Sequence, residues 1–353
     1  MGYQRILILR LSAVGDVIRT LPAVKAIKAH HPSSSISWVV EEPSQGLLES
    51  QPEIDEVILF PRKRWERGMK SAQGLMRTAW EVLSWVRLLR SRRFDLVLDF
   101  HGILKSGLLS FFSGSPKRIG YGRRASREGN FLFSNVRIDF VERVSRYEKN
   151  FRLLKGMGLE IPPQPYPVFV PKPDRDYINH FFDQAIPASK GPLIAIHPGT
   201  SRNTPYKRWF PGHYAQLADR LTMELGATVL YTWGPEELDW VKEIQGRMKG
   251  HSLLGPRTFS LTQLAEVYRR CHLYIGGDTG PMHLASLMGI PVVVLYGPTD
   301  PVVNEPIGIH KKVVKKVGCN PCRERSCRRL TCLEEITVED VFKATEEVLS
   351  LST

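Results

Sequence analysis

"CHLYIGGDTGPMHLASLMGIPVVVLYG", residues 271–297, contains an apolar run, a glycine-rich turn, a helical pattern and a second apolar run. The helix is predicted to begin near Pro281, because proline is favoured in the first turn of a helix, where its missing N–H costs nothing. The flanking runs 273–277 and 291–297 are rich in Val, Ile and Leu and are expected to be buried strands. Strand, turn, helix and strand in this order predict a βαβ unit of a parallel sheet.

The same alternation extends along the whole chain and falls into two sets. Helical patterns lie between the apolar runs, at 17–30, 72–90, 211–224 and 261–270. The predicted strands are 5–11, 36–40, 56–60 and 95–100 in the first set, and 193–197, 227–232, 273–277 and 291–297 in the second. We therefore expect an α/β fold with two Rossmann-like domains whose parallel sheets face a central cleft, and ligands at the carboxyl ends of the strands.

A proline-rich stretch separates the two sets. "LEIPPQPYPVFVPKPD", residues 159–174, holds six prolines from Pro162 to Pro173. Proline fixes φ and restricts the residue before it, so an extended segment is expected here. The predicted organisation is an N-terminal domain over 1–160, a linker over 161–175, a C-terminal domain over 176–335 and a terminal helix over 336–353.

The positive charge of the chain is concentrated in its first half. The net charge is +13, and residues 1–170 hold 27 Lys and Arg against 16 Asp and Glu, whereas 171–353 hold 22 against 20. Such an excess favours an anionic partner: a nucleic acid, an acidic membrane surface, or a phosphorylated or carboxylated substrate. No apolar run reaches the roughly 18 residues of a membrane span, and the N-terminus lacks a signal-peptide cleavage site, so a cytoplasmic protein is expected.

Two of the basic clusters receive different interpretations. Arg62, Lys63 and Arg64 are expected in an exposed loop after a strand, where a role in binding is favoured. In the helix over 72–90, Trp80, Leu83 and Leu88 are expected to form the core face, with the arginines of that segment in solvent.

The first strand ends in "LSAVGD", and Asp16 is the one carboxylate of this turn. A helix is expected to start at about Val17, so the simplest role for Asp16 is an N-cap. A carboxylate at the carboxyl edge of a first strand can also act as a general base. The stretch has no G-x-G-x-x-G, and the sequence therefore gives no support to a dinucleotide site.

Two loops in the second half have the composition of an anion site. In "HPGTSRNTPYKRWF", the N–H groups and hydroxyls of Gly199, Thr200 and Ser201 can cradle a phosphate that Lys207 would neutralise. A plain polar loop is the alternative. In "IGGDTGPMH", the N–H groups of Thr279 and Gly280 face the same way as the helix dipole, and His283 can add a donor. Asp278 would repel a phosphate, so it either caps the helix or meets hydroxyls or an N–H beside the phosphate.

Together, "LSAVGDVIRTLPAV", "HPGTSRNTPYKRWF" and "GGDTGPMHLASLMGIPVVVLYGPTDP" resemble the three signatures of glycosyltransferase family 9, the lipopolysaccharide heptosyltransferases. "ISWVVEE" at 36–42, "RKRW" at 62–65 and "DLVLDFHGILKSGLL" at 95–109 are more similar to the type I enzymes than to type II. The resemblance implies a GT-B enzyme. Its donor, ADP-L-glycero-β-D-manno-heptose, would bind the C-terminal domain, and its acceptor, the Kdo region of lipid A, the N-terminal one. It also implies peripheral association with the cytoplasmic face of the inner membrane.

The resemblance also assigns roles to residues. Asp16 takes the place of the general base and Lys207 that of the basic group near the donor phosphates. Asp278 matches the aspartate that contacts the donor sugar, and Glu236 matches the ribose-binding carboxylate, although adjacent Glu237 leaves the register open. The remaining donor-binding positions are Thr200, Ser201, Thr279, Gly280 and His283, and the acceptor-binding positions are Arg62, Lys63 and Arg64. Transfer would invert the anomeric carbon and require no metal.

Four of the five cysteines lie in "CNPCRERSCRRLTC", residues 319–332. Cys319, Cys322, Cys327 and Cys332 have the spacing C-x2-C-x4-C-x4-C, which can supply four thiolates to structural zinc or to an iron–sulfur cluster. Disulfides and free thiols are the alternatives, and a cytoplasmic location disfavours disulfides.

Other functions are compatible with parts of the sequence. A type II enzyme or another family 9 sugar transferase would share the donor motifs and differ in its acceptor. A basic nucleic-acid-binding protein would explain the charge, but it would not need two βαβ sets with paired motifs. We therefore expect no nucleic-acid partner.

Overall fold

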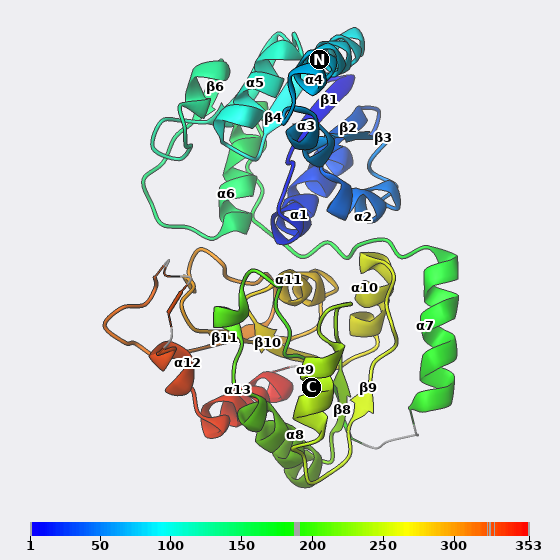
Figure 1. The fold of residues 1–353 in the computed structure, drawn as a ribbon, viewed down its shortest axis with the longest axis vertical. Helices are drawn as coiled ribbons and strands as arrows, with labels where there is room; N and C mark the ends of the chain where they lie inside the picture. The colour runs from blue at the N-terminus through cyan, green and yellow to red at the C-terminus, as the bar shows by residue number, and fades with distance from the viewer. Residues whose placement is uncertain (1, 187–190, 323, 325, 328, 352–353) are drawn as a thin grey trace. The chain divides into compact units, whose positions relative to one another are not determined.

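The structure, a computed structural model, describes residues 2–186, 191–322, 324, 326, 327 and 329–351 (Figure 1). The chain divides into two compact units, residues 1–163 and 164–353, and the boundary falls inside the proline-rich stretch. Along the described part of that stretch the chain has no regular structure up to residue 171, and helix α7 (Lys172–Ala185) then begins with Pro173 in its first turn. The helix therefore starts inside the expected linker, because proline is tolerated at this position.

The first unit is a parallel sheet with helices. Its strand order is β3-β2-β1-β4-β5-β6, and every neighbouring pair is parallel. The strands are β1 (Arg5–Leu9), β2 (Ser35–Val40), β3 (Glu56–Leu59), β4 (Leu96–Asp99), β5 (Lys117–Tyr121) and β6 (Val136–Ile138). The helices are α1 (Val14–His30), η1 (Glu42–Ser44), α2 (Gln45–Glu49), α3 (Arg62–Gly68), α4 (Ala72–Ser91), α5 (Leu104–Phe112), η2 (Asn130–Phe133), α6 (Arg146–Leu153) and η3 (Leu154–Met157).

The second unit repeats this plan with the strand order β12-β11-β10-β7-β8-β9. Its strands are β7 (Leu193–His197), β8 (Thr228–Tyr231), β9 (Leu253–Leu254), β10 (Leu273–Gly277), β11 (Val292–Tyr296) and β12 (His310–Val314). Besides α7, its helices are η4 (Pro205–Lys207), α8 (Pro211–Leu225), α9 (Leu238–Gln245), α10 (Leu261–Arg269), α11 (Gly280–Leu287), α12 (Thr331–Glu334) and α13 (Val338–Ser350). The terminal helix α13 packs on β11 and β12 and belongs to this unit.

The central strands form the cores. β4, β7, β10 and β11 are buried along their whole length, which is expected for parallel strands covered by helices on both faces. In each sheet the strand order reverses once, between β1 and β4 in the first unit and between β7 and β10 in the second. A ligand site is expected outside the carboxyl ends of these two strand pairs.

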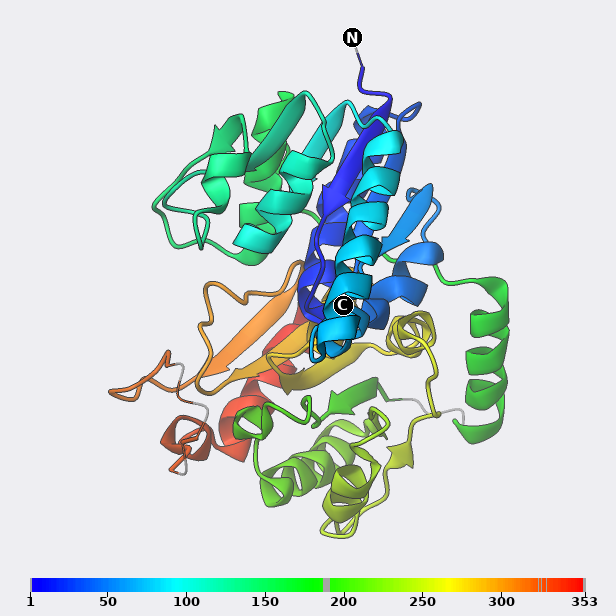
Figure 2. The same ribbon diagram turned by 45° about the horizontal axis from the view of Figure 1, so that its top comes forward.

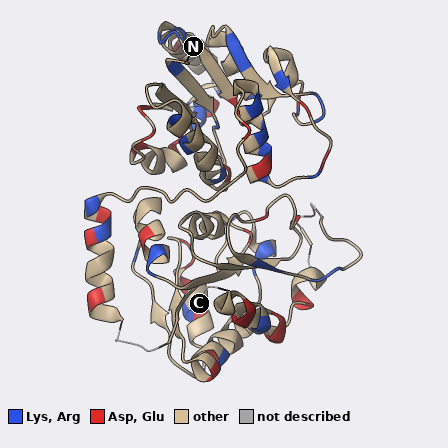
Figure 3. Ribbon diagram, turned by 180° about the vertical axis from the view of Figure 1, so that it is seen from behind, with Lys and Arg blue, Asp and Glu red and all other residues tan. Residues whose placement is uncertain are grey.

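Several local expectations are corrected by the structure. Helix α1 begins at Val14, so Asp16 lies inside its first turn and is not its N-cap, which is Ala13. The segment with Arg62, Lys63 and Arg64 forms the start of α3 and is not a loop. Strands β5, β6, β9 and β12 were not expected, because they are short or begin with charged residues. Figure 3 shows that Lys and Arg residues lie on strands of the first unit as well as on its helices, and β5 is one of these strands.

The expected core face of α4 is wrong. Trp80, Leu83 and Leu88 are exposed, whereas Val82, Trp85 and Leu89 pack into the hydrophobic core of the first unit. Figure 2 shows the course of α4 along this unit. Both sets recur at helical spacing, so the periodicity alone did not distinguish the buried stripe from the exposed one.

Candidate active site

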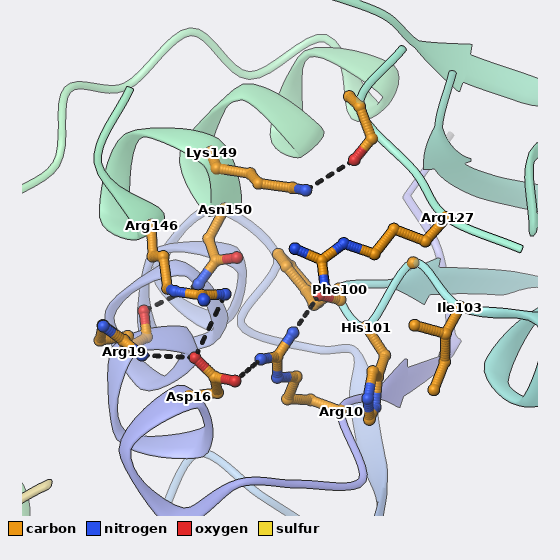
Figure 4. A pocket seen from close by; sticks show the side chains of 12 residues that line it. Arg10, Asp16, Arg19, Phe100, His101, Ile103, Arg127, Arg146, Lys149 and Asn150 are labelled. Atoms are coloured by element: carbon orange, nitrogen blue, oxygen red, sulfur yellow. Dashed lines mark hydrogen bonds and ion pairs between the residues drawn. The ribbon is translucent and has the colours of Figure 1, made fainter. Parts of the chain in front are cut away.

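Asp16 lies at the switch point of the first unit, in a pocket of about 170 Å³. The pocket lies at the carboxyl ends of β1 and β4, where β1 leads into α1 and β4 leads into α5. Figure 4 shows the side chains that surround the carboxylate, among them four arginines and one lysine. The pocket is lined by Arg10, Asp16, Arg19, Phe100, His101, Gly102, Ile103, Ala125, Arg127, Arg146, Lys149 and Asn150.

Three arginines contact the Asp16 carboxylate. Arg10 pairs with Oδ2, Arg19 donates to Oδ1 at 2.5 Å, and Nη1 of Arg146 lies 3.6 Å from Oδ1. Arg10 also donates to the carbonyl oxygen of Phe100 at 2.7 Å, which ties the strand β4 end to the cluster. Arg10 and Arg19 are buried, whereas Arg146 is partly exposed. The carboxylate is thus held by two fixed guanidiniums and one that solvent or a ligand can reach.

These contacts set the charge state of Asp16. Burial would raise its pKa, but the guanidiniums of Arg10, Arg19 and Arg146 together outweigh burial and hold the pKa well below its usual range. Asp16 is therefore ionised at neutral pH. An ionised carboxylate can accept a hydrogen bond from a substrate hydroxyl, and its basicity increases when one of the arginines is drawn toward another anion.

Two further titratable groups of the pocket are shifted in the same direction. Burial, followed by the charge of Arg10, lowers the pKa of His101 to about 3, so His101 is neutral at neutral pH. Its Nδ1 accepts the backbone N–H of Leu11 at 3.2 Å. Burial, and then Arg146, lowers the pKa of Lys149 to about 8, and its Nζ donates to the carbonyl of Ala125 at 2.6 Å. The excess of positive charge makes this pocket suited to an anionic ligand.

The basic residues expected to bind the acceptor lie in a different pocket of the first unit. Arg62, Lys63 and Arg64 line a pocket of about 260 Å³ together with Glu41, Glu42, Pro43, Leu59, Phe60, Pro61 and Arg67. Arg62 approaches Glu41 at 3.6 Å, and Arg64 pairs with Glu81 at 2.6 Å. The structure keeps them at the carboxyl edge of the first sheet, after β3, but does not bring them to Asp16.

Lys207, Asp278 and His283 come together at the switch point of the second unit. Nζ of Lys207 lies 3.5 Å from Oδ2 of Asp278 and donates to the Asp278 carbonyl at 3.3 Å. Nε2 of His283 lies 3.7 Å from Oδ1 of the same carboxylate. Asp278 does not cap α11, whose N-cap is Thr279. The carboxylate therefore orients a lysine and a histidine at the N-terminus of a helix, where Thr279 and Gly280 are partly exposed.

The loop after β7 is organised by its own hydroxyls. Thr200 is buried and donates to the carbonyl of Thr204 at 2.9 Å, and Arg208 donates to the Thr200 hydroxyl at 3.1 Å. Ser201 is exposed, and its Oγ lies 2.8 Å from the Thr204 hydroxyl. Thr200 thus shapes the loop, whereas Ser201 faces solvent.

Glu236 and Glu237 have different surroundings. Glu237 is buried, accepts the Gly234 N–H at 2.7 Å and lies 3.4 Å from Nε2 of His197. A Cβ at Gly199 would lie 2.2 Å from the Glu237 carboxyl carbon, so the glycine is needed for this approach. Glu236 is exposed. The buried carboxylate supports the loop, and the exposed one is accessible to a ligand.

The four clustered cysteines share one region of the second unit. Burial raises the pKa of the Cys332 thiol, and the neighbouring thiols of Cys319, Cys322 and Cys327 add to this effect. Cys332 lies in α12 against the core, and the Cys322 N–H donates to the Pro298 carbonyl at 2.8 Å. In the described part of the chain, no group of three or more His, Cys, Asp or Glu side chains is arranged to hold a metal ion.

Sequence reasoning missed the arginines around Asp16. Arg10 and Arg19 are buried although they carry charge, and Arg10 interrupts an apolar run while Arg19 follows two buried residues of α1. A charged residue at a position of the pattern that should be buried is the signal that could have found them, since such residues are almost always paired. Arg146, which comes from α6, could not be found in this way, because it is distant in sequence.

Each unit therefore gathers charged side chains at its own switch point, which is where open α/β sheets bind ligands. The family model of glycosyltransferase family 9 (heptosyltransferase) matches residues 82–332. The chain belongs to this family and is a glycosyltransferase with the GT-B arrangement of two parallel six-stranded sheets.

The similar proteins include lipopolysaccharide heptosyltransferases 1 and 2. The lipopolysaccharide core heptosyltransferase OpsX of Haemophilus influenzae is 28% identical over 320 residues, which cover 90% of this chain and 86% of the relative. Lipopolysaccharide heptosyltransferase 1 of Pseudomonas aeruginosa is 28% identical over 92% of this chain and 87% of its own length. Lipopolysaccharide heptosyltransferase 2 of Escherichia coli is 25% identical over 89% of this chain and 88% of its own.

Solved structures share the fold over nearly the whole chain. The family 9 glycosyltransferase of Veillonella parvula has a TM-score of 0.77 at 24% identity and covers 99% of this chain and 98% of its own. The E. coli heptosyltransferase WaaC, solved with ADP, has a TM-score of 0.72 at 23% identity and covers 98% of this chain and 100% of its own. No helix within the described residues is both long and apolar enough to span a bilayer.

Proposed function

We propose that the protein transfers L-glycero-D-manno-heptose from ADP-heptose to the Kdo region of lipid A, with inversion at the anomeric carbon. The observation that carries this proposal is Asp16, an ionised carboxylate held among arginines in a pocket that suits an anionic sugar. The membership of the chain in glycosyltransferase family 9 (heptosyltransferase) supports heptose as the transferred sugar.

In this proposal the second unit holds the donor. The N–H groups of Thr279 and Gly280 and the dipole of α11 face the diphosphate, Lys207 neutralises its charge, and His283 donates a hydrogen bond to it. Asp278 orients these two side chains and contacts the donor sugar. Ser201 contacts the phosphate from the loop that the hydrogen bonds of Thr200 hold in shape. Glu236 accepts hydrogen bonds from the ribose hydroxyls.

The first unit would hold the acceptor. Kdo carries a carboxylate, and Arg127, Arg146 and Lys149, which line the pocket, can bind such an anion. Binding draws Arg146 toward the acceptor carboxylate, because Arg146 is the arginine of the cluster that is partly exposed. This raises the pKa of Asp16 from its depressed value and makes it a better base when the substrate is present. Arg62, Lys63 and Arg64 would contact acceptor phosphates farther from the reacting hydroxyl.

The reaction follows as a single displacement. The acceptor oxygen forms a bond to the anomeric carbon while the bond from that carbon to the ADP oxygen breaks. The acceptor proton moves to a carboxylate oxygen of Asp16, and the electron pair leaves with ADP. Lys207, His283 and the N-terminus of α11 stabilise the charge that grows on the diphosphate. Since these groups supply positive charge, we propose that transfer needs no metal, and that activity persists in EDTA.

The type I and type II reactions differ in the acceptor that receives the heptose. We propose the type I reaction, addition of the first heptose, because the stretches 36–42, 62–65 and 95–109 resemble type I enzymes. A type II enzyme would add heptose only to an acceptor that already carries one. Mass spectrometry of Kdo-lipid A and of heptosyl-Kdo-lipid A, each incubated with ADP-heptose, tests this: addition to the first acceptor supports type I, and addition to the second alone excludes it.

The acceptor also implies a location. Kdo-lipid A is anchored in the membrane by its acyl chains, so we propose a protein that associates peripherally with the cytoplasmic face of the inner membrane. We propose no nucleic-acid partner.

For the four clustered cysteines we retain structural zinc or an iron–sulfur cluster as the proposal, and the thiols would have to close around the ion. Elemental analysis of protein purified without chelators tests it: close to one bound metal centre per chain, lost in Cys322→Ser, supports the proposal, and none excludes it.

A further inference from the structure

Helix α4 presents an apolar stripe directly away from the protein. Met76, Trp80 and Leu83 recur at helical spacing and are exposed, Trp80 by 65%. Leu89, which is buried, and Val82 and Trp85, which are partly buried, pack against the core instead. A tryptophan exposed to this degree, with two large apolar neighbours on the same stripe, is not explained by packing within the chain.

Helix α5 also carries exposed apolar side chains. It contacts α4, and its outward stripe consists of Leu104, Leu108, Phe111 and Phe112, of which Phe111 is 53% exposed. The 3-10 helix η2 packs on α5 and adds exposed Leu132. We call the set the α4–α5 surface: Met76, Trp80, Leu83, Leu104, Leu108, Phe111, Phe112 and Leu132. An exposed apolar area formed by neighbouring elements marks an interaction site.

The charges on these two helices are mostly positive. Arg77, Arg87, Arg90 and Lys105 lie on α4 and α5, against the single acidic residue Glu81. Glu81 is already paired with Arg64 and Arg77, at 2.6 and 3.3 Å. The Arg118 guanidinium lies 5.9 Å from the centre of the Phe111 ring. Apolar side chains with a basic rim are the composition of an interfacial membrane helix.

We propose that the α4–α5 surface inserts into the interfacial layer of an anionic lipid bilayer. The proposal rests on the proposed function, in which the acceptor is a membrane lipid, and it names the part of the fold that meets the membrane. The arginines and Lys105 are complementary to acidic headgroups, and the long basic side chains can reach the headgroups while Trp80 and Phe111 enter the acyl boundary. A second copy of the chain is a poorer occupant, because pairing two such surfaces would oppose their positive charges.

The test is co-sedimentation of the protein with vesicles of 30% phosphatidylglycerol in phosphatidylcholine, and with vesicles of phosphatidylcholine alone. The variant Trp80→Ser/Phe111→Ser is expected to lower the partition coefficient to the anionic vesicles by about tenfold or more. The matched control Met223→Ser/Phe259→Ser removes exposed apolar side chains from the second unit, where Met223 is 80% exposed, and should bind as the wild type does. Arg87→Gln/Arg90→Gln should reduce the partition by about fivefold for each charge.

Binding of the double serine variant at wild-type strength would overturn the proposal, as would wild-type protein that does not bind anionic vesicles. Circular dichroism and the thermal midpoint check that each variant is folded. Light scattering detects self-association, and a dimer that the double serine variant abolishes would assign the surface to a second copy. Transfer to a Kdo oligosaccharide without acyl chains is measured separately, with the variant expected to equal the wild type. Absence of that transfer with vesicle binding intact would refute the proposed function and leave the surface standing.

Discussion

Replacing Asp16 with asparagine removes the proposed base and the counter-charge of three guanidiniums at once. General-base catalysis contributes a factor of about 10² to 10⁴, so the rate of transfer should fall by this factor, or about 2.7–5.4 kcal/mol of barrier. Asparagine has nearly the same shape and cannot accept the proton. The residues proposed to bind the donor all come from the second unit, so the affinity for ADP should change by less than about twofold.

The same substitution should destabilise the first unit. Arg10 and Arg19 are buried, and removing one partner of a buried ion pair costs roughly 3–5 kcal/mol. Because Arg146 and the pocket are partly open to solvent, we expect the lower end, roughly 3 kcal/mol. For a unit of residues 1–163 this corresponds to a fall in thermal midpoint of about 6–12 °C.

The assay is steady-state transfer of heptose, followed by ADP release, at a temperature where both proteins are folded. Asp139→Asn is the matched control, since Asp139 is paired with Arg124 at 3.1 Å on the surface of the same unit. Because exposed ion pairs contribute little to stability, this variant should leave the thermal midpoint and the rate nearly unchanged. A rate for Asp16→Asn within about threefold of the wild type would refute the role of Asp16 as base, whatever its effect on stability.

Three other predictions follow from the sites. Lys207→Ala should reduce kcat by about 10²–10³, the usual effect of losing one group that stabilises transition-state charge. Lys242 is exposed on the surface, and Lys242→Ala should leave kcat unchanged. Equal kinetics for the two variants would exclude Lys207 from stabilising the leaving group. Glu236→Gln should raise the Kd for ADP with little effect on the thermal midpoint. Glu237 supports the loop from its buried side, so Glu237→Gln should lower the thermal midpoint. Calorimetry measures both quantities, and reversed effects of the two variants would contradict this assignment. The pKa of Asp16 is lower in the folded state, so its stabilising contribution is complete above the unfolded-state pKa of about 3.9 and is lost as pH falls through the folded-state pKa. The difference in thermal midpoint between wild type and Asp16→Asn should thus be constant from pH 7 to about pH 5 and shrink below about pH 4, and a difference that grew on acidification would be inconsistent with this sign.

The parallel sheets could be predicted because their central strands are buried on both faces. Runs such as 193–196 and 292–296 are apolar without interruption, and short apolar runs rich in Val and Ile between helical segments are typical of buried parallel strands. Strands β5 and β12 were missed because each begins with basic residues. In addition, β12 lies at the edge of its sheet, where one side has no neighbouring strand. The distinction between the two faces of α4 depended on which stripe met the sheet, and this is decided by tertiary packing.

The candidate site was predictable where it followed a strand and unpredictable where it depended on contacts distant in sequence. Asp16, Lys207 and Asp278 each lie at or near the carboxyl end of a strand beside the switch point, which a motif can indicate. The cluster around Asp16 also needs Arg146 from α6, and this contact joins residues 130 positions apart in the chain. The depressed pKa of Asp16 is a consequence of that contact and of two buried arginines, so no local pattern could reveal it.

The most direct test of the account is mass spectrometry of Kdo-lipid A incubated with ADP-heptose and either the wild-type protein or Asp16→Asn. The account predicts the mass of one added heptose with the wild type, release of an equal amount of ADP, and little or no product with the variant. A wild-type protein that binds ADP-heptose but leaves Kdo-lipid A unchanged would contradict the proposed acceptor, and failure to bind ADP-heptose would contradict the donor site.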